Sequence, residues 1–200
     1  VRNEQIEKLA VLADEVFSGK NDIEAMIRKS SRSDLATDEP KGEPHDPFHW
    51  PLQFPEVFER ENGGFDAIVG NPPFLGGQRI RESSGSSFRN FIVRNLADGR
   101  KGSADLVTYF FLQSFKLLRE RGGFGLLASN TISEGDTRQV GLEGMLADNA
   151  VIHAAYPNEA WPGKAAVVTS RIHVHKGNWK GQRFLNDLPA PYISAYLSDR

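Results

Sequence analysis

The sequence contains no cysteine, and its positive and negative charges nearly balance. The lack of cysteine excludes disulfide bonds, cysteine nucleophiles and thiolate zinc sites, and it fits a reducing cytoplasm. With 24 basic and 26 acidic residues, the chain has no overall positive charge to favour nucleic-acid binding across its whole surface. No apolar run approaches the ~20 residues of a membrane span, and no signal-peptide pattern is present. We therefore expect a cytoplasmic protein without a membrane partner.

The composition permits one sizeable core, because 39% of the 200 residues are hydrophobic. Apolar residues recur at helical spacing over residues 4–29, and residues 30–47 are rich in Ser, Asp, Pro and Gly. We predict a helical segment with a linker over residues 1–47. The chain opens on Val1 rather than Met and stops inside a polar run, so we expect a fragment of a longer polypeptide.

Strand and helix patterns alternate after residue 47, which favours an α/β fold. Four aromatic residues and two prolines predict an extended course over residues 48–58, with a turn of helix from Pro55. Ser103 is a plausible N-cap for the strongest helix pattern. Residues 177–200 lose all periodicity. The last predicted strand alternates, so that Ile172 and Val174 share one face and Arg171, His173 and His175 the other. The predicted elements are a buried strand at 67–69, a short helix carrying Phe88, Phe91, Ile92 and Leu96, a helix at 104–120, a parallel strand at 124–130, a helix near 139–148, and an antiparallel hairpin of strands 151–156 and 165–176.

The first predicted strand ends at an unusual motif, Asn71-Pro72-Pro73-Phe74. The two prolines make the loop stiff, and they add no backbone N–H that could compete for local acceptors. The Asn71 carboxamide oxygen and the Pro72 carbonyl offer two acceptors, which suit an NH2 group. The Phe74 ring suits a flat conjugated partner. An extruded adenine or cytosine presents both features, so the motif predicts a site for a flipped base.

The motif resembles the catalytic motif of amino methyltransferases that use S-adenosylmethionine, in the DNA adenine-N6 branch. Residues 69–77 narrow the resemblance to the methylase domains of type IIG and IIL restriction–modification polypeptides. The resemblance covers roughly residues 48–195. It implies the later half of a Rossmann-like class I methyltransferase sheet, with parallel strands and a terminal antiparallel hairpin. It also implies S-adenosylmethionine as cofactor, double-stranded DNA as partner, and no metal.

The resemblance assigns roles to individual residues. Asn71, Pro72, Pro73 and Phe74 match the catalytic motif, and Asn71 and Pro73 lie where the family also meets its cofactor. Asp105 begins the segment that in this family contacts cofactor or target base, although a structural role fits it equally. Trp161 stands where an aromatic residue packs on the flipped base opposite Phe74, unless it only closes the end of the sheet.

Basic residues near the motif suggest contacts to DNA phosphates. Arg79 and Arg81 fall in residues 76–87, a stretch that reads as a flexible polar loop, and Lys164 follows a glycine in the predicted hairpin loop. Such side chains hold phosphates of a distorted strand, but a solvated surface accounts for them equally. No histidine or carboxylate set has a metal-site spacing.

The family's glycine-rich cofactor loop has no counterpart in the chain. We therefore expect that the N-terminal half of the methylase domain and the target-recognition domain lie elsewhere, and that this chain alone binds the cofactor weakly or not at all. The expected domains are a partial catalytic domain over 48–180 and a linker over 181–200. Three alternatives remain: another amino substrate (cytosine N4 or a protein glutamine), a non-catalytic remnant that binds DNA or a partner chain, and a generic α/β domain with a chance motif.

Overall fold

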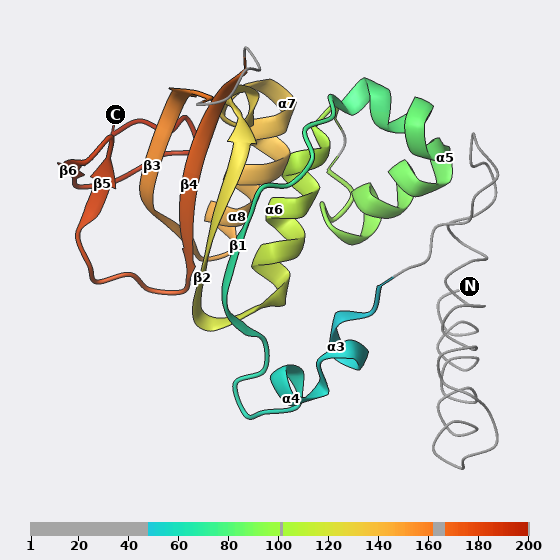
Figure 1. Ribbon diagram of the computed structural model, residues 1–200, viewed down its shortest axis with the longest axis horizontal. Helices are drawn as coiled ribbons and strands as arrows, with labels where there is room; N and C mark the ends of the chain where they lie inside the picture. The colour runs from blue at the N-terminus through green and yellow to red at the C-terminus, as the bar shows by residue number, and fades with distance from the viewer. Residues whose placement is uncertain (1–47, 101, 162–166, 200) are drawn as a thin grey trace.

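The computed structural model describes residues 48–100, 102–161 and 167–199. The helix predicted over residues 4–29 and the side chain of Lys164 lie outside this part. The described residues form a six-stranded mixed sheet with helices packed on one face (Figure 1). No described helix is both long and apolar enough to cross a membrane.

The strand order in the sheet is β1-β2-β4-β3-β5-β6. Strands β1 and β2 pair in parallel, as do β3 and β5, and the other neighbouring pairs are antiparallel. The predicted α/β fold class, with parallel strands and a later antiparallel hairpin, is confirmed. The strands are β1 (Phe65–Gly70), β2 (Leu118–Ser129), β3 (Ala150–Ala160), β4 (Val168–Lys176), β5 (Arg183–Leu185) and β6 (Leu188–Ala190).

Helix α6 (Leu106–Leu117) packs its buried face against the centre of the sheet, where Phe111 meets Phe124 edge to face at 5.3 Å between ring centroids. A 3₁₀ turn at Asn130–Ser133 and a π-helical turn at Gln139–Glu143 lie between β2 and β3. The α-helices are α3 (Trp50–Gln53), α4 (Pro55–Phe58), α5 (Gly77–Asn95), α6 (Leu106–Leu117), α7 (Gly135–Arg138) and α8 (Gly144–Ala147).

Strand β1 forms where it was predicted, but the expectation that it is fully buried is wrong. Ile68 packs against the core, whereas Ala67 and Val69 alternate onto the opposite face. Val69 is 86% exposed. Because β1 is the edge strand, no described strand pairs with its outer side. An apolar, exposed edge is unusual in a complete sheet.

The long helix, predicted over 104–120, begins later and ends earlier than predicted, at Leu106 and Leu117. Its N-cap is Asp105, whose side chain accepts the N–H of Val107, and not Ser103. The helix ends at Leu117, and residues 118–123, predicted as its last turn and the following loop, begin β2. Pairing of Leu118 with Phe65 and of Gly123 with Ala67 explains the difference, since these contacts between distant segments outweigh local helix propensity.

Residues 77–95 form helix α5, so the expectation of a flexible loop over 76–87 is wrong. Gly85 kinks the helix at φ 83°, a conformation that glycine adopts without strain. Ile80, Ile92 and Val93 are buried and anchor the helix to the core. Burial of these side chains stabilises a helix that its serines and glycines would not predict.

Two other segments differ from the prediction. Residues 50–53 form a turn of helix rather than an extended segment, with Pro51 in the first turn, where its missing N–H costs no hydrogen bond. The predicted helical turn at Pro55–Phe58 is confirmed. Strands β5 and β6 occupy a region whose sequence showed no pattern, because each is only three residues long.

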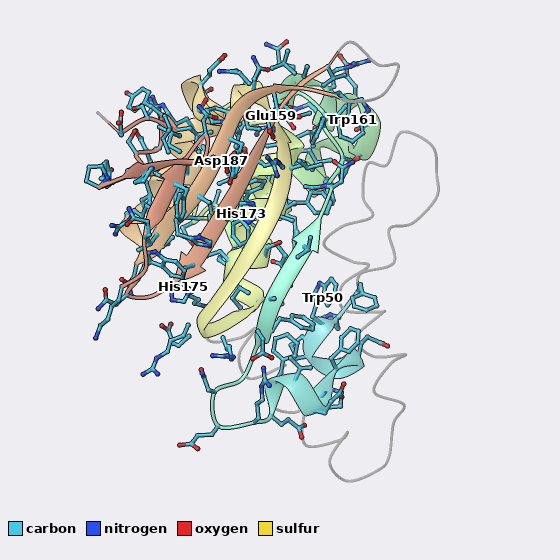
Figure 2. All side chains as sticks on the ribbon, turned by 60° about the vertical axis from the view of Figure 1, so that its left-hand side comes forward. Trp50, Glu159, Trp161, His173, His175 and Asp187 are labelled. Carbon is cyan, nitrogen blue, oxygen red and sulfur yellow. The ribbon has the colours of Figure 1, made fainter. Side chains whose placement is uncertain are left out.

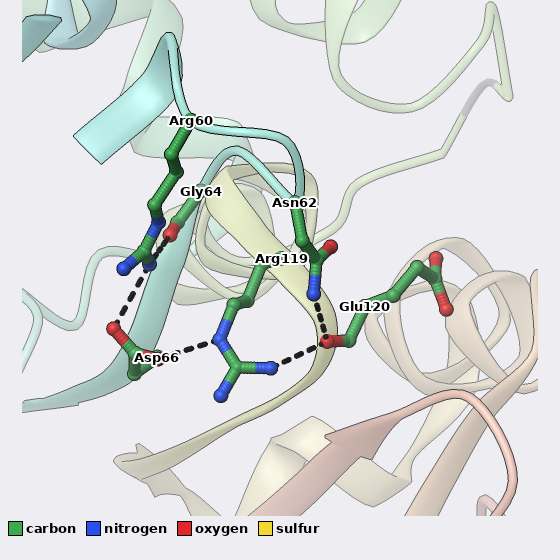
Figure 3. Close-up of polar contacts among 6 residues, drawn as sticks. All are labelled: Arg60, Asn62, Gly64, Asp66, Arg119 and Glu120. Atoms are coloured by element: carbon green, nitrogen blue, oxygen red, sulfur yellow. Dashed lines mark hydrogen bonds and ion pairs between the residues drawn. The ribbon is translucent and has the colours of Figure 1, made fainter. Parts of the chain in front are cut away.

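The start of β1 is held by aromatic and ionic contacts. The Phe65 ring meets those of Trp50, Phe54 and Phe58 at centroid distances of 5.3 to 5.7 Å. Asp66 accepts from Arg60 at 2.9 Å and from Arg119 of β2 at 2.5 Å (Figure 3). These two guanidinium groups lower the pKa of Asp66 to about 2. The aromatic and the ionic contacts together fix the start of β1 to the segments packed around it.

Candidate functional site

The loop over residues 71–75, which we call the motif loop, leaves the carboxyl end of β1. Asn71 and Pro73 are exposed, Pro72 is buried, and Phe74 is half-buried against the core. Ligands of open α/β sheets bind beside loops of this kind, at the carboxyl ends of parallel strands. The motif loop is therefore the leading candidate for the functional site.

The acceptor groups of the motif loop are unused within the described part of the chain. The Asn71 carboxamide and the Pro72 carbonyl make no hydrogen bond to any described residue. Polar groups of folded proteins normally find partners in the protein or in water. Two unused acceptors on a stiff loop can bind an amino group that carries two hydrogens.

Asp105 lies directly behind the motif loop and is only 8% exposed. Its Oδ1 accepts the N–H of Leu75 at 3.1 Å and the N–H of Val107 at 3.0 Å. The Leu106 N–H donates a hydrogen bond to the Leu75 carbonyl at 2.8 Å. The same carboxylate oxygen thus serves both the motif loop and the N-terminus of α6, and its role toward a cofactor stays a prediction.

Trp161 lies at the same end of the sheet as the motif loop, where β1 and β3 finish (Figure 2). The strand register agrees: Gly70, the last residue of β1, lies beside Leu126 of β2, and Leu126 pairs with Ile172 of β4. The hairpin of β3 and β4 extends past Ile172 toward the end of the sheet where β1 finishes. The Trp161 backbone N–H donates to the Val167 carbonyl at 3.0 Å, at the end of the hairpin. Strands β1 and β3 are three spacings apart, about 14 Å at ~4.8 Å each. Trp161 and Phe74 therefore lie at the same end of the sheet but follow strands that are not adjacent.

Arg79 and Arg81 are exposed in the first turns of α5, immediately after the motif loop. Neither forms an ion pair with a described residue. Their charge is therefore available to an anionic ligand beside the motif loop. Within the described residues, no group of three or more histidine or acidic side chains is placed to hold a metal ion.

A second polar surface covers the face of the sheet opposite α6, and sequence patterns revealed only its β4 residues. Glu159, His173, His175 and Asp187 lie on this face (Figure 2). Arg171 binds Glu159 through two hydrogen bonds of 2.6 and 2.9 Å. Alternation along β4 predicted one shared face for Arg171, His173 and His175, but the pairing with β3 was needed to bring Glu159 to them.

His153 makes this second surface sensitive to acid. Its ring stacks on Trp179 at 4.3 Å between centroids and lies 5.9 Å from that of His173. Burial first, and then the positive charge of His173 and His175, lower the pKa of His153 to about 4. The folded protein therefore keeps His153 neutral at pH values where the unfolded chain, with a pKa near 6.5, is protonated.

We expect stability to fall as the pH drops from about 6.5 toward 4. The unfolded state binds more protons in that window, so the free energy of unfolding decreases with decreasing pH. The substitution His153→Phe keeps a ring on Trp179 but removes the titration. Urea denaturation at pH 7.5 and pH 5 should show that the free energy of unfolding decreases less in the variant than in the wild type. Equal losses in both proteins would contradict this account of His153.

Comparisons with known proteins identify a family and a shared fold. The family model of the Eco57I restriction-modification methylase matches residues 3–156. The type IIL restriction-modification enzyme MmeI, solved in complex with DNA, matches with a TM-score of 0.58 at 19% sequence identity, over 80% of this chain and 23% of MmeI. A modification subunit of a putative type I restriction enzyme from Vibrio vulnificus matches with a TM-score of 0.44 at 17% identity, over 68% of this chain and 28% of that subunit. No curated protein sequence matches.

The match to MmeI shows a common fold, and the chain spans about a quarter of the length of MmeI. The family match covers β1, the motif loop, α5, α6 and β2, which are the elements that build and support the candidate site.

Proposed function

Because the chain belongs to the Eco57I restriction-modification methylase family, we propose that its motif loop is the catalytic loop of a DNA adenine-N6 methyltransferase. The complete enzyme acts in the cytoplasm on double-stranded DNA, as the modification activity of a restriction–modification system. The observation that carries the proposal is a pair of acceptors, Asn71 and Pro72, that bind no described residue and lie on a stiff loop at the carboxyl end of β1.

The chemistry of this loop is positioning and electrostatics. The Asn71 carboxamide oxygen and the Pro72 carbonyl accept the two N6 hydrogens of an adenine that has left the DNA stack. These hydrogen bonds direct the nitrogen lone pair away from the ring plane and raise its electron density. The N6 proton leaves during or after attack. No covalent bond to the protein is formed.

Aromatic and basic residues around the loop supply the remaining substrate contacts. The exposed part of Phe74 packs on the extruded adenine, and Trp161 contacts the base or its neighbouring nucleotide from the same end of the sheet. Stacking on an aromatic side chain contributes about 1–3 kcal/mol per base, which is comparable to the few kcal/mol that extrusion costs. Arg79, Arg81 and Lys164 bind phosphates of the distorted strand.

The methyl donor is S-adenosylmethionine, whose sulfonium group supplies an activated methyl. The described residues fit one side of its site, because Asn71 and Pro73 are exposed beside the free edge of β1. No described strand pairs with the outer side of β1, and its Val69 is 86% exposed. Both observations support the proposal that a further strand, with the glycine-rich cofactor loop, adds beside β1 from another part of the polypeptide. A target-recognition domain elsewhere in the polypeptide selects the DNA sequence. The chain alone then binds the cofactor weakly.

Transfer of tritium from methyl-labelled cofactor tests the proposed substrate class in the complete enzyme. We expect label in DNA and none in protein. DNA isolated from cells that express the active enzyme is the matched control, because its sites are already methylated and it should accept little label. Label in a protein glutamine would assign the loop to another amino substrate, and no transfer to either acceptor would favour a non-catalytic DNA-binding role.

A further inference from the structure

The motif loop is fixed to the rest of the protein at Leu75. Both backbone groups of Leu75 bind the N-terminus of α6: the Leu75 N–H donates to Asp105 Oδ1 at 3.1 Å, and the Leu75 carbonyl accepts from the Leu106 N–H at 2.8 Å. A residue bound through both groups cannot rotate without losing both bonds. The two prolines between Asn71 and Leu75 restrict the loop further, because each ring locks its own φ. The place of Asn71 is thus determined by β1 on one side and by Leu75 on the other.

Asp105 joins this anchor to a rigid support. Its Oδ1 accepts from Leu75 and also from the Val107 N–H at 3.0 Å, so one oxygen tethers the loop and caps α6. Helix α6 carries more buried residues than any other described helix, and its Val107 and Phe111 are fully inaccessible to solvent. A hydrogen bond to a carboxylate is stronger than one between neutral groups. The Asp105 side chain therefore fixes the loop to α6, beside the backbone bond from Leu106 to Leu75.

The opposite side of the same segment is held by α7. The Asp105 N–H donates to Thr137 Oγ1 at 3.2 Å, and the Ser103 N–H donates to Asp136 Oδ2 at 2.7 Å. Gly77 lies so close to this segment that a Cβ on it would approach the Ser103 carbonyl to 2.4 Å. Residues 102–106, which we call the clamped segment, are therefore pressed between the motif loop and α7.

We infer that Asp105 is a positioning residue for methyl transfer, acting through Leu75 on the Asn71 and Pro72 acceptors. The inference rests on the proposed function of the motif loop. Both partners of the Asp105 oxygen are backbone N–H groups of the protein, and the side chain is nearly inaccessible, so its effect on the reaction is geometric. Displacement of a reacting group by about 1 Å costs on the order of 100-fold in rate.

Three substitutions at residue 105 separate positioning from stability. Asp105→Asn keeps an oxygen at the same reach and retains both hydrogen bonds. Asp105→Ser keeps a good N-cap for α6, but its hydroxyl lies one carbon closer to the backbone and does not reach Leu75. Asp105→Ala loses both bonds. Asp136→Ala is the matched control, because it removes the bond to Ser103 on the side of the clamped segment away from the motif loop.

The complete enzyme is assayed for kcat and KM with DNA, and amide hydrogen exchange is followed at residues 71–76. We expect Asp105→Ser to lower kcat about 10- to 100-fold, with unchanged KM for DNA and near-wild-type thermal stability. Exchange at Leu75 should accelerate in this variant. Asp105→Asn should restore kcat to within a few-fold of the wild type, and Asp136→Ala should leave it close to the wild-type value.

The positioning role would be overturned if Asp105→Ser kept the wild-type kcat. It would also be overturned if Asp105→Ser and Asp136→Ala lowered kcat equally. The exchange measurement keeps this test separate from the proposed function. If the wild type transfers no methyl group to DNA, the proposed function fails. Unchanged protection of Leu75 in Asp105→Ser then shows, without any activity, that the anchor fails as well, whereas accelerated exchange shows that the anchor exists.

Discussion

Asn71→Ala is expected to lower the rate of methyl transfer by the complete enzyme about 100-fold or more, with an intact fold. The substitution removes the carboxamide oxygen that accepts an N6 hydrogen, and loss of one such group from a preorganised site typically costs about 10²–10³ in kcat. Stability should change little, because the Asn71 side chain is exposed and makes no hydrogen bond to a described residue. Steady-state kinetics and thermal denaturation of the same preparations measure both effects.

Asn62→Ala is the matched control for this substitution. Asn62 is also exposed, but it lies before the start of β1, at the end of the strand away from the motif loop, where it donates to the Glu120 carbonyl at 3.2 Å (Figure 3). Removing it should leave the rate of methyl transfer unchanged. Near-wild-type transfer by Asn71→Ala would refute the catalytic assignment of the motif.

Gly77→Ala is expected to have the largest structural effect. A Cβ at Gly77 would lie 2.4 Å from backbone atoms of Ser103 and Ala104, which cannot move aside as a flexible side chain can. The clamped segment or the first turn of α5 must shift, and overpacking of this kind costs about 1–3 kcal/mol. Because the shift occurs where the motif loop is anchored, methyl transfer should fall together with the free energy of unfolding.

Gly76→Ala provides the comparison for Gly77→Ala. Gly76 has φ −54°, which any residue adopts, and a Cβ there meets nothing within 4 Å. This variant should be as stable as the wild type or slightly more so. Chemical denaturation of the two variants in parallel measures the difference. Equal stability and activity of both variants would show that the close crossing at Gly77 has no energetic consequence.

The sequence predicted the elements whose patterns are local. The apolar run at 67–69 and its abrupt end at Asn71 located β1 and the motif loop, and alternation from Val168 to Val174 located β4 and its buried face. These features depend on residues only a few positions apart in the sequence. Hydrophobic periodicity and the residue preferences of turns predict such local features well. The family resemblance carried by residues 69–77 was likewise confirmed by the match of the family model.

Features that depend on contacts between distant residues were not predictable in this way. Ser103 looked like the N-cap of α6, but Asp105 takes that place because it also binds Leu75, thirty residues earlier in the chain. The first half of helix α5 was missed, because burial of Ile80 stabilises it and its own serines and glycines do not. The lowered pKa of His153 depends first on its burial and then on His173 and His175, which the pairing of β3 with β4 brings near it.

The identity of the methylated base tests the central claim most directly. DNA is methylated by the complete enzyme, digested to nucleosides, and analysed by chromatography and mass spectrometry against authentic standards. If the Asn71 and Pro72 acceptors hold adenine N6, the product is N6-methyldeoxyadenosine, and it disappears with Asn71→Ala. Recovery of N4-methyldeoxycytidine instead, or of N6-methyldeoxyadenosine at wild-type levels from Asn71→Ala, would contradict the account.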